Sequence, residues 1–239
     1  MTSDSPVTLA VDIGGTGLKI EVLDAGGQPI TNRKRIPTPR PATPPAIIAG
    51  IRELADGVPG FDRISAGFPG VVREGRILTA PHLGTEDWRG FDLAAALRES
   101  FGRPARVLND AEVQGFGLIE GRGLEFVLTL GTGAGTAIFH NGHIGPHLEL
   151  SQHPVHKDMS YDEYIGDAAL EKEGKEHWNH RVHHVLGILE TLTNFDVLYL
   201  GGGNAEKVER LPDRVVRGTN EAGLTGGVKL WGPGWPADS

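Results

Sequence analysis

The stretch VLTLGTGAGTAIF, residues 127–139, contains two apolar segments typical of β-strands, separated by glycines and threonines. Glycine inside a strand weakens it and usually marks a bend or a place where something approaches the backbone closely. The composition of this stretch therefore predicts two strands joined by a turn that another group approaches.

The same design occurs near the start of the chain. Residues 7–30, VTLAVDIGGTGLKIEVLDAGGQPI, predict a strand, a glycine-rich turn, a strand, a hairpin turn and a third strand. The Gly-Thr-Gly turn at residues 15–17 recurs at residues 131–133, an offset of 116 (131 minus 15), and the hairpin turn recurs at the same offset. Two halves of one chain therefore open with the same pattern.

Each half continues with strands and helices in alternation. Amphipathic spacing and capping residues predict helices at residues 44–56, 92–101, 110–120 and 161–193, and apolar runs predict strands at 64–68, 105–109 and 197–200. Alternation of this kind indicates an α/β fold with parallel strand pairing. The tail, residues 231–239, is too rich in Pro and Gly for a regular element.

Composition excludes several classes of protein. The 239 residues include 23 Lys and Arg against 31 Asp and Glu, a net charge of -8, which argues against a nucleic-acid or an acidic membrane partner. The chain has no cysteine, so disulfides and thiolate metal sites are excluded. Neither a signal peptide nor a long apolar run is visible, and we expect a cytoplasmic protein.

The two glycine-rich turns are candidate phosphate sites. A turn of this kind can direct several backbone N–H groups at one anion, and glycine leaves room for the phosphate. Neither turn fits the P-loop or the dinucleotide fingerprint. Alone, each turn is more typical of a tight hairpin, but their duplication favours two turns that hold one phosphoryl chain from opposite walls of a cleft.

A carboxylate follows the predicted strand at residues 105–109. Ligands of open α/β sheets bind at the carboxyl ends of the strands, where Asn109 and Asp110 lie. Asp110 could be a base that takes a proton from an attacking hydroxyl, or either residue could simply cap the next helix.

These motifs together resemble the ROK family of sugar kinases. The resemblance is carried by Asp12-Ile-Gly-Gly-Thr, Gly67-Phe-Pro-Gly, Asn109-Asp110-Ala, Leu130-Gly-Thr-Gly-Ala-Gly, Glu149 and Gly201-Gly-Gly-Asn, in this order over nearly the whole chain. Lys19, Tyr199-Leu-Gly-Gly-Gly-Asn-Ala and Asn220-Glu-Ala-Gly resemble the polyphosphate-using glucokinases of that family in particular. The resemblance implies a two-lobed, actin-like ATPase fold of the α/β class with duplicated sheet cores.

The resemblance also implies a role for each matched residue. Asp110 would be the catalytic base. The substrate-binding residues would be Asn109, Glu149, Gln152, His153, Asp162, Gly67, Pro69 and Gly70. The phosphate or nucleotide would contact Asp12, Gly14, Gly15, Thr16, Lys19, Thr132, Gly133, Gly135, Gly201, Gly202 and Gly203.

The reaction implied is transfer of a phosphoryl group from ATP or polyphosphate, with Mg²⁺, to a hexose, most naturally the 6-hydroxyl of glucose. We expect a small lobe at residues 1–115, a large lobe at 116–218, and a C-terminal helix at 219–239 that returns to the small lobe. We expect no protein-bound metal site, no nucleic-acid or membrane partner, and a homodimer.

The sugar site departs from the family pattern. Where relatives read Glu-x-Gly-His, this chain reads Glu149-Leu150-Ser151-Gln152, followed by His153. The second sugar-binding glutamate of the family falls at Asp162, one methylene shorter, with Glu163 as the neighbouring candidate. These changes leave open an alternative, a sugar-binding or regulatory protein of the same fold with weakened turnover.

Overall fold

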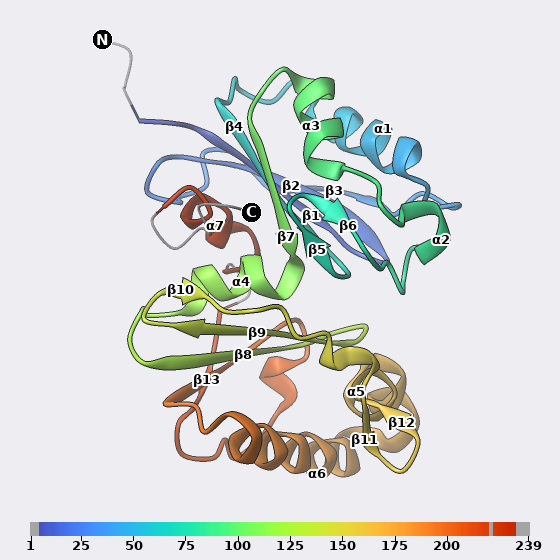
Figure 1. Ribbon diagram of the computed structural model, residues 1–239, viewed down its shortest axis with the longest axis vertical. Coiled ribbons are helices and arrows are strands. Elements are labelled where there is room, and N and C mark those ends of the chain that lie inside the picture. Colours follow the sequence, from blue (N-terminus) through green and yellow to red (C-terminus); the bar gives the residue numbers. More distant parts are fainter. Residues whose placement is uncertain (1–4, 220–221, 233–239) are drawn as a thin grey trace. The chain divides into compact units, whose positions relative to one another are not determined.

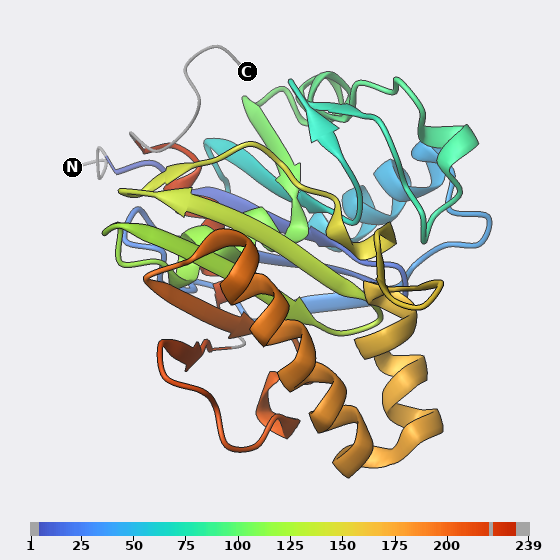
Figure 2. The same cartoon turned by 60° about the horizontal axis from the view of Figure 1, so that its bottom comes forward.

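The computed structural model describes residues 5–219 and 222–232 of the chain. The chain divides into two compact units: unit 1 comprises Met1–Gly117 and Glu221–Ser239, and unit 2 comprises Leu118–Asn220. Each unit contains a five-stranded sheet with helices packed against it (Figures 1 and 2). No helix in the described ranges combines the length and the apolar character needed to cross a membrane.

Unit 1 is built on a mixed sheet. Its strands lie in the order β3 (Lys34–Pro37), β2 (Gly17–Leu23), β1 (Thr8–Ile13), β4 (Arg63–Phe68) and β7 (Ala105–Asn109). The pairs β3–β2 and β2–β1 are antiparallel, and the pairs β1–β4 and β4–β7 are parallel. Helices α1 (Pro44–Ala55) and α3 (Leu93–Phe101) pack on the sheet through one apolar cluster, whereas α7 (Ala222–Lys229) packs on β1 through another.

Local sequence explains where these helices begin and end. Proline at the first turn starts α1, where a missing N–H costs nothing. Asp92 caps α3, because its Oδ1 accepts a hydrogen bond of 2.8 Å from the N–H of Ala95. Gly102 ends α3 in the left-handed conformation with φ 62°. The predictions for these two helices are confirmed.

Unit 2 repeats the architecture. Its strands lie in the order β10 (His143–Ile144), β9 (Ala134–His140), β8 (Leu124–Leu130), β13 (Val197–Gly201) and β14 (Val215–Arg217). The first three are antiparallel neighbours and the last three are parallel neighbours, as in unit 1. Helix α6 (Asp167–Thr193), interrupted at Gly174, buries Trp178, Val182 and Leu186 in the core of this unit.

The repeat is therefore a property of the fold. Strand β8 begins 116 residues after β1 (124 minus 8), the offset that the glycine-rich turns predicted. Both sheets have the same strand order and the same sequence of antiparallel and parallel pairs. The predicted α/β class and the duplicated sheet cores are confirmed.

One strand prediction was wrong. The third strand was expected directly after the turn at Gly26, but β3 begins only at Lys34, and the intervening chain makes a single bridge between Leu23 and Pro29. The side chain of Asp24 accepts hydrogen bonds from the N–H groups of Gly26 and Gln28, and the Asp24 carbonyl accepts one from the N–H of Gly27, so the predicted turn forms although no strand follows it directly.

Shorter elements connect the main ones. They are β5 (Val72–Arg73), β6 (Arg76–Ile77), α2 (Thr85–Trp88), α4 (Asp110–Leu118), η1 (Leu150–Gln152), β11 (Pro154–His156), β12 (Met159–Ser160), α5 (Tyr161–Ile165) and η2 (Ala205–Lys207). Most of the predicted loose tail, residues 233–239, and the start of the predicted C-terminal helix at Asn220 lie outside the described residues.

Helix α7 is held against unit 1 by close backbone contact. A Cβ at Gly226 would lie 1.9 Å from the carbonyl oxygen of Val113 in α4. The indole N–H of Trp231 donates a 2.9 Å hydrogen bond to the Ser65 hydroxyl, which itself donates to the carbonyl of Gly227. The C-terminal segment is thus tied to β4 and α4.

The first prediction tests this contact. We expect Gly226→Ala to lower the free energy of unfolding by about 1–3 kcal/mol, because the added methyl overlaps the α4 backbone. Gly187→Ala is the matched control: Gly187 is an exposed residue inside α6 with open space at its Cβ position, so we expect stabilisation by about 0.5–1 kcal/mol. Denaturant unfolding of both variants measures the difference, and equal effects would contradict the packing assignment.

Candidate active site

Asp110 is the first residue of α4, directly after β7. The preceding residue, Asn109, caps this helix: its Oδ1 accepts a 2.9 Å hydrogen bond from the N–H of Ala111, and Glu112 Oε2 accepts one of 3.1 Å from the N–H of Asn109. This reciprocal arrangement is a capping box. Asn109 and Glu112 therefore provide two of the hydrogen bonds that cap α4. Asp110 Oδ1 also accepts a hydrogen bond of 2.8 Å from the N–H of Ala111.

Asn109 also fixes the end of the neighbouring strand. Its amide nitrogen donates to the carbonyl oxygens of Gly70 at 3.1 Å and Phe68 at 3.4 Å. The side chain is 5% exposed, so its hydrogen-bonding capacity is spent inside the protein. Asn109, predicted to bind the sugar directly, is positioned here to hold β4 and α4 together.

Small residues leave room beside Asp110. A Cβ at Gly67 would lie 3.3 Å from the Cα of Asp110. Pro69 and Gly70 are buried in the turn that follows, where a Cβ at Gly70 would lie 2.1 Å from the carbonyl oxygen of Thr79. The Gly-Phe-Pro-Gly motif thus shapes the backbone that approaches the predicted base.

Asp12 and Lys19 form an ion pair on the same face of the unit 1 sheet. They are directly opposite in the β1–β2 register, and Lys19 Nζ lies 2.7 Å from Asp12 Oδ2. Both side chains are partly accessible, at 25% for Asp12 and 36% for Lys19. Asp12 is also the register partner of Gly67 in β4, so the pair and the predicted base belong to one region of unit 1.

The first glycine-rich turn, residues 14–16, joins β1 to β2. The N–H of Gly14 donates to the carbonyl of Gly17 at 3.0 Å, and the Thr38 hydroxyl donates to the carbonyl of Gly14 at 2.6 Å. A Cβ at Gly15 would meet the side chain of His82 at 3.2 Å. Thr16 is exposed at the tip of the turn.

The second glycine-rich turn, residues 131–133, joins β8 to β9 in unit 2. The N–H of Gly131 donates to the carbonyl of Gly133 at 3.0 Å, and Thr132 is exposed. Gly135 follows in β9, opposite Thr129. The segment at residues 201–203 lies against the same region, since a Cβ at Gly202 would lie 2.3 Å from the carbonyl oxygen of Leu130. The predicted phosphate residues of unit 2 are therefore brought together.

Asp162 bridges the second turn and the predicted sugar loop. Its Oδ1 accepts a 2.7 Å hydrogen bond from the N–H of Ala134, and its Oδ2 accepts one of 3.0 Å from Gln152 Nε2. A Cβ at Gly133 would lie only 2.3 Å from Asp162 Oδ1. Sequence reasoning placed Asp162 on the sugar, but nothing in the sequence indicated that it abuts the phosphate turn.

Glu149 lies at the start of η1, which packs on β9 and α5. Its Oε1 accepts a hydrogen bond from the Ser151 hydroxyl, and its Oε2 lies 3.5 Å from His147 Nε2. Burial alone would raise the pKa of Glu149, but the hydrogen bonds from His147 and Ser151 together outweigh burial and hold the pKa below its usual range. Glu149 is therefore an ionised acceptor at neutral pH.

His153 is exposed after η1. In the described ranges, no group of three or more His, Asp or Glu side chains is arranged to hold a metal ion. His156, another member of this histidine-rich stretch, stacks on Tyr164 with ring centroids 5.3 Å apart, which gives it a packing role. Sequence reasoning missed the partners that orient the site: His147, Ser151 and the capping role of Glu112.

The second prediction tests the contact between Gly133 and Asp162. We expect Gly133→Ala to lower the free energy of unfolding by about 1–3 kcal/mol, because the methyl would overlap the carboxylate. In an Asp162→Ala background the same methyl has space, so the two changes should be non-additive, with a coupling of about 0.5–3 kcal/mol. Denaturant unfolding of the wild type, both single variants and the double variant measures it.

Gly203→Ala is the matched control, since open space surrounds the Cβ position of Gly203. We expect Gly203→Ala to change the free energy of unfolding little and to show no coupling to Asp162→Ala. Strict additivity of Gly133→Ala and Asp162→Ala would contradict the contact.

Comparison with known proteins identifies the family to which the chain is similar. The profile of the ROK family matches residues 8–147, more than half of the chain. Polyphosphate glucokinase of Mycobacterium leprae (strain TN) is 33% identical over 217 residues, which cover 84% of this chain and 64% of that protein, just under two thirds of its length. The enzyme of the same description from Mycobacterium tuberculosis (strain ATCC 25618 / H37Rv) is 32% identical over 215 residues, covering 84% and 78%.

Solved structures of similar proteins have the same fold as this chain. Inorganic polyphosphate/ATP-glucomannokinase from Arthrobacter sp. strain KM superposes with a TM-score of 0.84 at 27% identity, covering 93% of this chain and 97% of that one. A ROK family glucokinase from Streptomyces griseus, crystallised with glucose and AMPPNP, has the same fold, with a TM-score of 0.76 at 19% identity and coverage of 94% and 98%. The predicted actin-like ATPase fold is confirmed, and the chain belongs to the ROK family of sugar kinases.

Proposed function

We propose that the chain transfers a phosphoryl group from polyphosphate or ATP to a hexose hydroxyl, the 6-hydroxyl of glucose being the preferred acceptor, with Asp110 as general base. The observation that carries the proposal is the placement of Asp110 directly after the carboxyl end of β7, as the first residue of α4, where the hydrogen bonds of Asn109 and Glu112 hold the backbone around it. A carboxylate at the carboxyl end of a parallel strand stands where ligands of open α/β sheets bind, and it can act there as a general base.

In the proposed reaction, Asp110 accepts the proton of the hexose hydroxyl as that oxygen attacks the terminal phosphorus of the donor. The new bond joins the hexose oxygen to phosphorus, and the bond from phosphorus to the bridging oxygen of the donor breaks. The shortened donor leaves with the electron pair of the broken bond. Lys19 and the N–H groups of the two glycine-rich turns would bind the phosphoryl oxygens as negative charge redistributes.

The residues of unit 1 fit a donor-bound Mg²⁺. This ion is usually held by one or two carboxylates together with substrate phosphates and water, and Asp12 offers a partly accessible carboxylate beside Lys19. When bound, Mg²⁺ would neutralise phosphate charge. Asp12 would hold it through Oδ1 or through water, because Oδ2 is engaged by Lys19.

On the acceptor side, we propose that Glu149 accepts hydrogen bonds from the sugar hydroxyls. Its lowered pKa keeps it ionised, and an ionised carboxylate binds hydroxyls more strongly than a neutral one does. Gln152 and the exposed His153 flank it on η1 and offer further polar groups. Asp162 would act through its hydrogen bonds to Gln152 and Ala134.

A second candidate is a sugar-binding or regulatory protein of the same fold with little turnover. The observation that favours it is the replacement of the family's sugar-site histidine by Gln152. A panel of hexoses assayed with Mg²⁺, with ATP and with polyphosphate in parallel separates the two: turnover supports the kinase, and binding of a hexose without turnover supports the regulator.

The third prediction concerns Asp110. We expect Asp110→Asn to lower kcat by about 10²–10⁴-fold while hexose binding by calorimetry and the melting temperature change little, because an amide keeps the shape but cannot take the proton. Asp92→Asn is the matched control, the same substitution at the start of another helix of unit 1. Near-normal kcat with a lowered melting temperature would contradict the assignment of Asp110 as the base.

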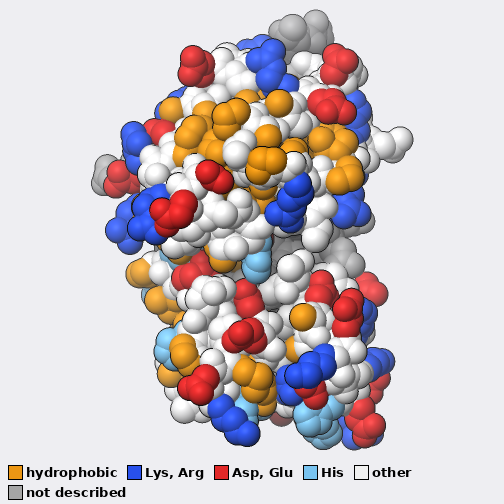
Figure 3. Space-filling view, turned by 90° about the vertical axis from the view of Figure 1, so that its right-hand side faces the viewer, with side chains coloured by type: hydrophobic (Ala, Val, Ile, Leu, Met, Phe, Trp, Pro, Cys, Tyr) orange, Lys and Arg blue, Asp and Glu red, His pale blue; other side chains and the backbone are white. Residues whose placement is uncertain are grey.

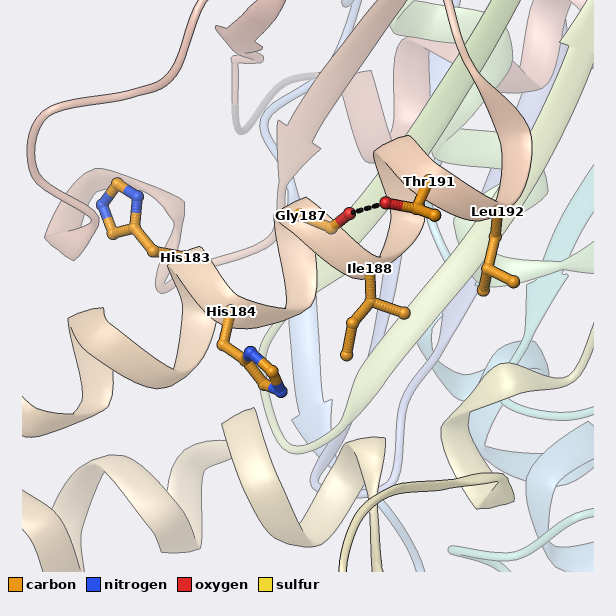
Figure 4. Close-up of a pocket in the computed structure, with 6 residues that line it drawn as sticks. All are labelled: His183, His184, Gly187, Ile188, Thr191 and Leu192. Atoms are coloured by element: carbon orange, nitrogen blue, oxygen red, sulfur yellow. Dashed lines mark hydrogen bonds between the residues drawn. The ribbon is translucent and has the colours of Figure 1, made fainter.

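We further propose that the chain forms a homodimer through the outer face of α6. That face carries an open groove of about 540 Å³ lined by His183, His184, Gly187, Ile188, Thr191 and Leu192 (Figure 4). Leu192 is 66% exposed, and Gly187 in the middle of the groove would let a second helix approach closely. In the proposed dimer the same face of a second copy would pack on it about a twofold axis.

The fourth prediction tests this association. Sedimentation equilibrium should give a dimer for the wild type and a monomer for Leu192→Glu, because burying a carboxylate in the interface is costly. Val216→Glu is the control, since Val216 is also an exposed hydrophobic residue but lies on β14. A wild type that stays monomeric, or a Leu192→Glu variant that stays dimeric, would contradict the proposed interface.

A further inference from the structure

Two arginines outside the residues assigned above lie at the first glycine-rich turn. Arg40 Nη2 donates a 2.6 Å hydrogen bond to the carbonyl oxygen of Gly15. The side chain of Arg35 lies over Gly17, where a Cβ would be 2.6 Å from Arg35 Nε. Both arginines are exposed. Two guanidinium groups of one segment, residues 35–40, therefore lie at the predicted phosphate turn.

Arg35 also continues a row of charged residues across the sheet. Lys19 in β2 is the direct register partner of Asp12 in β1, and Arg35 in β3 is the direct partner of Lys19. Direct partners in a sheet project to the same face. The row runs from Gly67 in β4, beside Asp110, to β3 at the edge of the sheet, a span of about 14 Å at the usual spacing of about 4.8 Å between strands.

The charges at this turn do not balance. Lys19 is paired with Asp12, but within residues 5–219 and 222–232 neither Arg35 nor Arg40 pairs with a carboxylate. Three cations and one anion leave a surplus of two positive charges, on a chain whose net charge is -8. On the face drawn in Figure 3, by contrast, acidic and basic side chains are interspersed over unit 2.

Neighbouring cations of the same segment are neutralised or engaged. Arg33 pairs with Glu21 at 3.4 Å. Lys34 Nζ donates to the carbonyl oxygens of Leu54 and Asp56. Neither of these two cations is directed at the turn, so the positive charge at the turn comes from Lys19, Arg35 and Arg40.

We propose that Arg35 and Arg40 bind donor phosphates beyond the transferring group, and that Arg35 is the residue that selects a long polyphosphate over ATP. The inference rests on the proposed function and names the donor class of the same site. Every phosphate of a polyphosphate chain carries negative charge, whereas the charge of ATP ends at its nucleoside. A cationic row that extends to the sheet edge matches the longer anion.

The two arginines should act differently. Arg40 is bonded to the turn itself, so its loss should disturb the turn and weaken every donor. Arg35 lies at the far end of the row, on the edge strand, so its loss should weaken the long donor selectively. A guanidinium can donate two parallel hydrogen bonds to one phosphate, which an amide side chain cannot reproduce.

Titration calorimetry with Mg²⁺ tests the proposal without turnover. The probes are ATP, tripolyphosphate and long-chain polyphosphate, and the proteins are the wild type, Arg35→Gln, Arg40→Gln and Arg33→Gln. We expect Arg35→Gln to weaken long-chain polyphosphate about tenfold or more, the loss of a charge-assisted hydrogen bond, with ATP unchanged. Arg40→Gln should weaken all three probes, and Arg33→Gln none.

Equal weakening of ATP and long-chain polyphosphate by Arg35→Gln, or no weakening, would overturn the selective role of Arg35. A wild type that binds ATP but no polyphosphate would overturn the donor class, and phosphorylation of a hexose by ATP would then leave the proposed function intact. Conversely, selective binding of polyphosphate by a wild type that phosphorylates no hexose would support the cationic row and refute the proposed function.

Discussion

The hydrogen bonds of one buried side chain, Asn109, hold together the elements on which the candidate active site depends. Its amide nitrogen donates to the carbonyl groups of Phe68, at the end of β4, and of Gly70, and its amide oxygen accepts from the N–H of Ala111, the second residue of α4. A buried amide with this many partners is costly to disturb, because each broken bond leaves an unpaired polar group away from water. This arrangement fixes the backbone on both sides of Asp110, whose own Oδ1 also accepts from the N–H of Ala111.

The second constraint is close backbone approach, repeated in both units. At Gly67 and at Gly133 the missing Cβ lets an acidic residue, Asp110 or Asp162, come against the backbone. In unit 1 that acidic residue begins a helix after a parallel strand, and in unit 2 it lies in the first turn of α5. The two contacts are not related by the repeat, since Gly133 corresponds to Gly17 at the offset of 116 and Gly67 lies in β4, whose counterpart is β13.

The sequence was sufficient to predict the fold class, the repeat and most of the main helices, because these depend on local periodicity, capping residues and glycine spacing. The third strand could not be placed, because the turn at Asp24 forms as expected but is followed by a single bridge at Pro29, and regular pairing with β2 begins only at Lys34. The partners of Asp162 and the approach of Arg35 to Gly17 could not be predicted from the sequence either. Both depend on register between segments far apart in the chain, which no local pattern encodes.

The departures from the family pattern in the sugar loop are best understood as a pair. The residue that replaces the histidine, Gln152, donates directly to the residue that replaces the second glutamate, Asp162, at 3.0 Å. Random decay of an unused site would not be expected to leave two altered residues hydrogen-bonded to each other while one of them also accepts from the N–H of Ala134, directly after the second glycine-rich turn. A shorter acid reaches the turn without colliding with Gly133, and an amide supplies the donor that its second oxygen requires. The altered loop therefore has the properties of a rebuilt site, in which the hydrogen bonding of the sugar loop is coupled to the geometry of the phosphate turn, and this coupling favours the kinase over the binding protein.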